Sequence, residues 1–214
     1  MMLIGGPFLV VSVAAALGYG LVLQFRPGGV FRTLVKCLAV GALAVWSWMS
    51  GAPPLLTAGL VLSTVGDAFL AQDPKRWLPP GLASFLLAHI LYVVFFLEIG
   101  GVNVLLAQPI RLLGGGFALA LGVSLVALLW KDLGALRPAV IAYVLAISAM
   151  VGSAMSLDPS RWLAMAGAVA FMASDGVLSW RLFRIGDKPA VVADHLVWWL
   201  YAGGQLGIAL AFLA

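Results

Sequence analysis

Two aspartates, Asp67 and Asp175, lie inside stretches of sequence that are otherwise almost wholly apolar. Each follows a small residue in a similar phrase, Gly-Asp-Ala-Phe-Leu in the first case and Ser-Asp-Gly-Val-Leu in the second. A carboxyl group inside a membrane costs about a few kcal/mol, so it usually marks a reaction site, an ion path or a structural ion pair. We therefore take Asp67 and Asp175 as the candidate catalytic residues.

The composition of the chain indicates an integral membrane protein. Of its 214 residues, 64% are hydrophobic and 9% are charged, which is too apolar for a water-soluble core. The net charge is +4, but the basic residues are scattered singly between apolar runs and form no stripe. We therefore expect membrane lipids as partners, and no nucleic acid.

Eight segments are long and apolar enough to be transmembrane helices, which need about 20 residues. They lie near residues 3–23, 34–50, 53–71, 79–97, 112–130, 138–157, 162–180 and 191–213. Prolines support several of the starts, where a missing backbone N–H does least harm: Pro53 and Pro54, Pro79 and Pro80, Pro138, and Pro189. The prediction is an all-α polytopic membrane bundle of eight helices, with residues 1–214 forming a single membrane domain.

The charges in the connections predict the orientation of the chain. The connections after spans one, three, five and seven hold ten Lys and Arg residues, whereas those after spans two, four and six hold two. By the positive-inside rule, both termini lie outside and the odd-numbered connections face the cytoplasm. We expect a multi-pass protein of a cell membrane, such as a bacterial inner membrane. Asp67 and Asp175 then both lie toward the cytoplasmic leaflet.

The two halves of the sequence echo each other. Asp67 precedes His89 by 22 residues, and Asp175 precedes His195 by 20, with a basic connection and a proline between them in both cases. Four spans in each half would make a parallel repeat, related by an axis along the membrane normal. The match is short, and an unduplicated chain is the alternative.

Each candidate aspartate also has a simpler interpretation as half of an ion pair at the membrane edge. The nearby cations are Lys75 and Arg76 after Asp67, and Arg181 and Arg184 after Asp175. The doubling of the Asp-x-x-Leu phrase favours a functional role for both.

The two histidines limit what other chemistry the chain can do. His89 and Tyr92 are three residues apart and share one helix face, but a buried histidine bonded to a neighbouring helix is an equal alternative. Asp194 and His195 lie close to the interface, where solvation is easy. Two histidines with a carboxylate would be admissible for a catalytic zinc, yet no close ligand pair supports it. We expect neither a metal nor another cofactor.

The phrases around the aspartates resemble the motifs of a known family. Residues 65–70 and 80–92 resemble the central motif of the lysoplasmalogenase-like family of eight-span membrane proteins. Residues 173–178 and 201–205 resemble its C-terminal motif. Together these stretches cover spans three, four, seven and eight in family order. The other four spans match only as apolar helices.

The resemblance implies hydrolysis of the vinyl ether bond of a lysoplasmalogen, a 1-alkenyl lysophospholipid. The products are a fatty aldehyde and a glycerophospho-headgroup. Asp67 and Asp175 match the paired acidic positions of the family, and the other polar motif positions are matched by His89, Tyr92, Tyr201 and Gln205. Ala202 stands where family members often carry a second tyrosine, which puts the headgroup preference in doubt.

Two carboxyls in unequal surroundings suit this reaction. One can stay protonated and donate a proton to the alkene, while the other stays ionised and stabilises the oxocarbenium ion or activates water. The sequence leaves open which aspartate takes which part. The cytoplasmic cations Lys75, Arg76, Arg181, Arg184 and Lys188 are candidates for binding the phosphate, although topology alone would also explain them.

Two other functions remain open from the sequence. Intramembrane acids and a four-plus-four repeat are also found in transporters, so a transporter or a protein that translocates a lipid without cleaving it is an alternative. A lysolipid-binding protein without hydrolase activity is the third interpretation.

Overall fold

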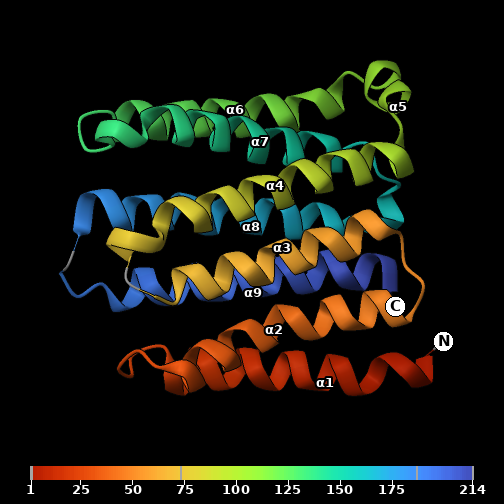
Figure 1. Ribbon diagram of the computed structural model, residues 1–214. Helices are drawn as coiled ribbons and strands as arrows, with labels where there is room; N and C mark the ends of the chain where they lie inside the picture. Colours follow the sequence, from red (N-terminus) through yellow and green to blue (C-terminus); the bar gives the residue numbers. More distant parts are fainter. Residues whose placement is uncertain (1, 73, 187, 214) are drawn as a thin grey trace. The chain divides into compact units, whose positions relative to one another are not determined.

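The fold is given by a computed structural model that describes residues 2–72, 74–186 and 188–213 (Figure 1). Within these residues every regular element is a helix and no strand occurs, which confirms the all-α prediction. The α-helices are α1 Met2–Gly18, α2 Val30–Met49, α3 Pro54–Leu70, α4 Pro74–Gly100, α5 Val102–Ala107, α6 Ile110–Leu129, α7 Arg137–Ala154, α8 Trp162–Trp180 and α9 Val191–Leu213. Two π-helical turns, η1 Tyr19–Leu23 and η4 Arg181–Ile185, extend α1 and α8.

The helices support a polytopic membrane protein. In the described part of the chain, seven helical spans are long and apolar enough to cross a membrane. Helix α3 is also apolar, but its 17 residues are fewer than the 18 of the shortest of these seven spans. The predicted count of eight is therefore not confirmed, although α3 lies at the lower end of the length range of membrane spans.

Most predicted boundaries agree with the structure to within a few residues, and those of α8 and α9 agree fully. The prediction that Pro79 and Pro80 begin a helix is wrong, because α4 begins at Pro74 and contains both. The carbonyls that these prolines leave without a donor lie four residues earlier, in the first turn of the helix, where the loss is least harmful. The short helix α5 was not predicted.

The described residues form two compact units. The first comprises the chain up to Tyr92 together with its last residues from Ala209, and the second comprises Val93–Ile208. The prediction of a single domain stays a prediction. Three candidate site residues belong to the first unit, namely Asp67, His89 and Tyr92, and the other three, Asp175, Tyr201 and Gln205, belong to the second.

In the first unit, α2 packs between α1 and α3, and α3 packs closely against α4 through glycine. A Cβ atom on Gly66 would lie 2.5 Å from the ring of Phe85, and one on Gly59 would lie 2.7 Å from the ring of Tyr92. Both glycines therefore form notches that receive an aromatic ring, as small residues commonly do between membrane helices. This pairing fixes the antiparallel register of α3 and α4, and the Ser84 hydroxyl adds a 2.7 Å hydrogen bond to the Leu62 carbonyl.

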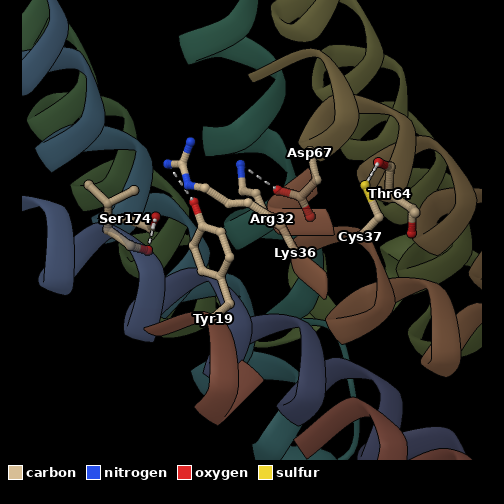
Figure 2. A network of polar contacts seen from close by, with 8 residues as sticks. Tyr19, Arg32, Lys36, Cys37, Thr64, Asp67 and Ser174 are labelled. Carbon is tan, nitrogen blue, oxygen red and sulfur yellow. Dashed lines mark hydrogen bonds and ion pairs between the residues drawn. The ribbon is translucent and has the colours of Figure 1, made fainter. Parts of the chain in front are cut away.

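In the second unit, α7 packs against α6 and α8, and α8 meets α9 at another close crossing. A Cβ atom on Gly167 would lie 2.5 Å from the Gly204 carbonyl oxygen. The Ser174 hydroxyl donates a 2.8 Å hydrogen bond to the Val197 carbonyl on α9 (Figure 2). Ser84 and Ser174 thus each hold two neighbouring helices together by a hydrogen bond to a backbone carbonyl.

Candidate active site

Asp67 lies near the C-terminal end of α3 and forms an ion pair with a lysine on the neighbouring helix. Its side chain is 2% exposed, and its Oδ1 lies 3.1 Å from Nζ of Lys36 on α2 (Figure 2). The lysine side chain is itself only 12% exposed. A buried carboxylate of this kind requires such a partner, because an uncompensated charge is very costly away from water.

The cation found beside Asp67 is Lys36, which was not one of the two candidates that the sequence offered. Of the two candidates, the side chain of Lys75 lies outside the described residues, and Arg76 stacks over the ring of Trp77 at 5.3 Å. Lys36 was one of the ten Lys and Arg residues counted for the membrane topology. It stood inside the predicted span 34–50, however, and a lysine within an apolar span was a signal that it needs an anionic partner.

Other polar side chains of α2 lie on both sides of Lys36. Arg32 lies one helical turn before Lys36, and its Nη2 donates to the Tyr19 hydroxyl and to the Gln24 carbonyl, both at 3.2 Å. On the other side of Lys36, the Cys37 thiol contacts the Thr64 carbonyl of α3 at 3.7 Å. Figure 2 shows Tyr19, Arg32, Lys36 and Asp67 following one another along this part of the first unit.

His89 and Tyr92 are fully buried on α4. Nδ1 of His89 lies 2.6 Å from the Phe85 carbonyl, one turn earlier on the same helix, whereas the predicted alternative placed such a bond on a neighbouring helix. Because Phe85 faces Gly66 and Tyr92 faces Gly59, His89 lies level with a point on α3 about one turn before Asp67. The role of both residues in substrate binding stays a prediction.

In the second unit, Asp175 is half-buried on α8 and receives a hydrogen bond from a tyrosine. The Tyr143 hydroxyl, on α7, lies 2.5 Å from Oδ2 of Asp175. Tyr143 was missed from the sequence, because a tyrosine in an apolar span is indistinguishable from a packing residue. Asp67 thus faces a cation, and Asp175 accepts a hydrogen bond from a neutral hydroxyl.

The two arginines that the sequence offered as partners of Asp175 are bound to other carboxylates. Nε of Arg181 lies 2.8 Å from Asp194, and the same guanidinium donates to the Gly186 carbonyl. Arg184 lies 3.1 Å from Asp132. The predicted ion pairs with Asp175 are therefore wrong, and these arginines tie the turns at this end of the second unit together.

Tyr201 and Gln205 lie one turn apart on α9, so they share a face of that helix. Gln205 is fully buried, and the ring of Tyr201 meets the ring of Phe171 edge-on at 5.1 Å. Phe171 precedes Asp175 by one turn on α8, so Tyr201 lies beside the helix that carries the aspartate. Their role in binding a substrate stays a prediction.

In residues 2–72, 74–186 and 188–213, no group of three His, Cys, Asp or Glu side chains is placed so that it could hold a metal ion.

Comparison with known families identifies the group to which the chain is related. The model of the YhhN family matches residues 31–212, which include both aspartates and all four polar candidates. The chain belongs to the YhhN family.

Several curated relatives of this YhhN protein are named lysoplasmalogenase. The chain is 37% identical to human lysoplasmalogenase TMEM86B, over 86% of this chain and 76% of that protein. It is 31% identical to human lysoplasmalogenase TMEM86A, over 84% and 77% of the two chains. A lysoplasmalogenase of Mycobacterium bovis is 34% identical over 73% of this chain, which spans 59% of that protein. No solved structure matches the chain.

Replacing Lys36 by Met tests the buried ion pair. We expect this variant to lower the free energy of unfolding by about 3–5 kcal/mol, because breaking a buried pair leaves one charge uncompensated. The double variant Lys36→Met with Asp67→Asn removes both charges and should regain most of that loss. Equilibrium unfolding in detergent, followed by tryptophan fluorescence, measures both changes.

The control is Lys131→Met, which removes an exposed lysine from the connection between α6 and α7 and should leave the stability nearly unchanged. A Lys36→Met protein as stable as this control would contradict the ion pair. So would a double variant no more stable than Lys36→Met.

Proposed function

We propose that this YhhN protein is a membrane hydrolase that cleaves the vinyl ether bond of a lysoplasmalogen. The observation that carries the proposal is the similarity, over 86% of the chain, to a human protein named lysoplasmalogenase. The apolar helices suit such a substrate, because a single-chain lipid can keep its tail in the hydrocarbon and its headgroup at the membrane edge.

The proposed reaction adds one water molecule across the vinyl ether. A proton is added to the alkene carbon remote from the ether oxygen, which leaves an oxocarbenium ion. Water then adds to the carbon that bears the oxygen and loses a proton. The resulting hemiacetal collapses to a fatty aldehyde and frees the sn-1 hydroxyl of the glycerophospho-headgroup. The protein must therefore supply a proton donor and a negative group.

The different surroundings of the two aspartates support different roles for them. We assign the negative group to Asp67, because the ammonium of Lys36 at 3.1 Å stabilises its ionised form as a pair. We assign the proton donor to Asp175. The Tyr143 hydroxyl is neutral, so its hydrogen bond orients the Asp175 carboxyl whether or not that carboxyl carries the proton.

The remaining polar candidates are proposed to bind and orient the substrate and the attacking water. His89 and Tyr92 are buried on α4, and Tyr201 and Gln205 are buried on α9. Buried polar side chains can direct a water molecule or a hydroxyl group by hydrogen bonds. This proposal rests on their burial and on their match to the polar positions of the family motifs.

Replacement of the aspartates tests the assignment. With a synthetic 1-alkenyl lysophospholipid and purified protein in detergent, we expect Asp67→Asn and Asp175→Asn each to lower the rate of aldehyde release at least about 100-fold, the usual scale of acid and base catalysis. In mildly acidic buffer, added formic acid should restore part of the activity of Asp175→Ala but not of Asp67→Ala, because an external acid can replace a missing proton donor.

Asp158→Asn, at an exposed acid between α7 and α8, is the matched control and should keep the wild-type rate. An active Asp67→Asn or Asp175→Asn variant would remove that residue from the mechanism. Rescue of Asp67→Ala alone would reverse the two roles.

We further propose that both termini lie outside the cytoplasm and that Asp67 and Asp175 lie toward the cytoplasmic leaflet of a bacterial inner membrane. The bias of ten basic residues against two in the connections supports this orientation. In a bacterial host, alkaline phosphatase fused after residue 214 should be active, since that enzyme works only outside the cytoplasm. An inactive but stable fusion would reverse the orientation.

A further inference from the structure

Arg32 is a partly buried guanidinium whose contacts differ from those of Arg181 and Arg184 in the second unit. Arg181 and Arg184 each lie against a carboxylate. The acceptors recorded for Arg32 are neutral, namely the Tyr19 hydroxyl and the Gln24 carbonyl, each 3.2 Å from Nη2. The ring of Tyr19 also lies 5.6 Å below the guanidinium carbon. The positive charge of Arg32 is thus held in place without a carboxylate among the described residues.

Arg32 also carries a donor that the described part of the chain does not satisfy. Its Nε is buried from solvent and has no hydrogen-bond acceptor among the described residues. A buried donor without an acceptor is rare and destabilising, and it commonly marks the place of a water, an ion or a ligand. The parallel N–H groups of a guanidinium fit the oxygens of a phosphate particularly well.

The depth of Arg32 matches the dimensions of the proposed substrate. Arg32 lies two residues after the start of α2, and Lys36 lies one turn further in, about 6 Å along the helix axis. In a lysophospholipid, five single bonds separate the sn-1 oxygen from the phosphorus, which spans roughly 6 Å when extended. A phosphate at Arg32 therefore places the ether oxygen at the depth of the Lys36–Asp67 pair.

The local backbone supports a binding role for the end of α1 and the start of α2. Tyr19, which holds Arg32, begins the π-helical turn η1, and such turns are frequent at functional sites. The basic residues of α2 are Arg32 and Lys36. Because Lys36 is paired with Asp67, Arg32 is the one that can bind an anionic headgroup.

We propose that Arg32, oriented by Tyr19, binds the phosphate of the lysophospholipid headgroup. This inference rests on the proposed function for the identity of the lipid. Arg32 was not among the phosphate-binding candidates that the sequence offered, which were Lys75, Arg76, Arg181, Arg184 and Lys188. Of these, Arg181 and Arg184 are paired with Asp194 and Asp132. Tyr19 is a positioning residue in this account, and Arg32 is the residue that contacts the ligand.

The test compares two ligands that differ only in the phosphate. A 1-O-alkyl lysophosphatidylcholine and a 1-O-alkylglycerol of the same chain length have no vinyl ether, so their binding does not depend on catalysis. We expect wild-type protein in nonionic detergent to bind the phosphate-containing lipid about 10–100-fold more tightly, the scale of charge-assisted hydrogen bonds. Arg32→Gln should lose this preference and bind the alkylglycerol as the wild type does.

Two further variants and one further ligand make the result specific. Arg32→Lys keeps the charge without the paired donors and should keep part of the preference. Arg26→Gln removes an exposed charge from the same connection between α1 and α2 and should keep all of it. Inorganic phosphate should compete only weakly, because it lacks the tail; strong competition would assign Arg32 to free phosphate instead.

The inference is overturned if wild-type protein does not distinguish the two lipids, or if Arg32→Gln keeps the distinction. It is also overturned if Arg32→Gln lowers the affinity for both ligands equally, because that result is expected of an arginine with a purely structural role. Should Arg32→Gln fail to fold, the wild-type comparison and Arg32→Lys still decide. Wild-type protein that binds the phosphate-containing lipid at Arg32 but releases no aldehyde from a vinyl ether would refute the proposed function and leave this site intact.

Discussion

A carboxylate among apolar helices is stable only if another group compensates its charge, and the contact of Lys36 with Asp67 meets this requirement in the first unit. The pair ties α2 to α3. The ring of Phe85 in the notch of Gly66, next to Asp67, ties α3 to α4. The aspartate is thereby held by three helices, which gives a reacting group the fixed position that catalysis needs.

The carboxyl of the second unit has a different kind of partner, and the proposed chemistry depends on that difference. Asp175 is half-buried and accepts a hydrogen bond from Tyr143 of α7. The arginines that follow it in sequence are bound to Asp132 and Asp194. One carboxyl lies beside a cation and the other accepts a hydrogen bond from a hydroxyl, and carboxyls in unequal surroundings divide acid and base roles in many hydrolases.

Much of the fold could be predicted from the sequence, because apolar runs of membrane length report directly on helices; the bounds of α8 and α9 follow from their runs alone. Local rules failed where a helix begins in a polar turn, as α4 does at Pro74 before its internal prolines. The candidate aspartates were visible because they interrupt apolar runs. Their partners were not, since Lys36 and Tyr143 lie on other helices and the pairing of helices is a tertiary fact. A lysine inside a predicted span was a usable signal, whereas a tyrosine there was not.

Carbon protonation is the central claim of the proposed mechanism, and hydrolysis in D2O tests it most directly. Aldehyde released from a 1-alkenyl lysophospholipid would be reduced at once to the alcohol and examined by mass spectrometry, with unlabelled aldehyde added to D2O as the control for exchange. Protonation of the alkene by Asp175 predicts one deuterium at the carbon next to the former carbonyl. Product without deuterium there would show that the vinyl ether is cleaved without proton transfer to carbon and would contradict the mechanism.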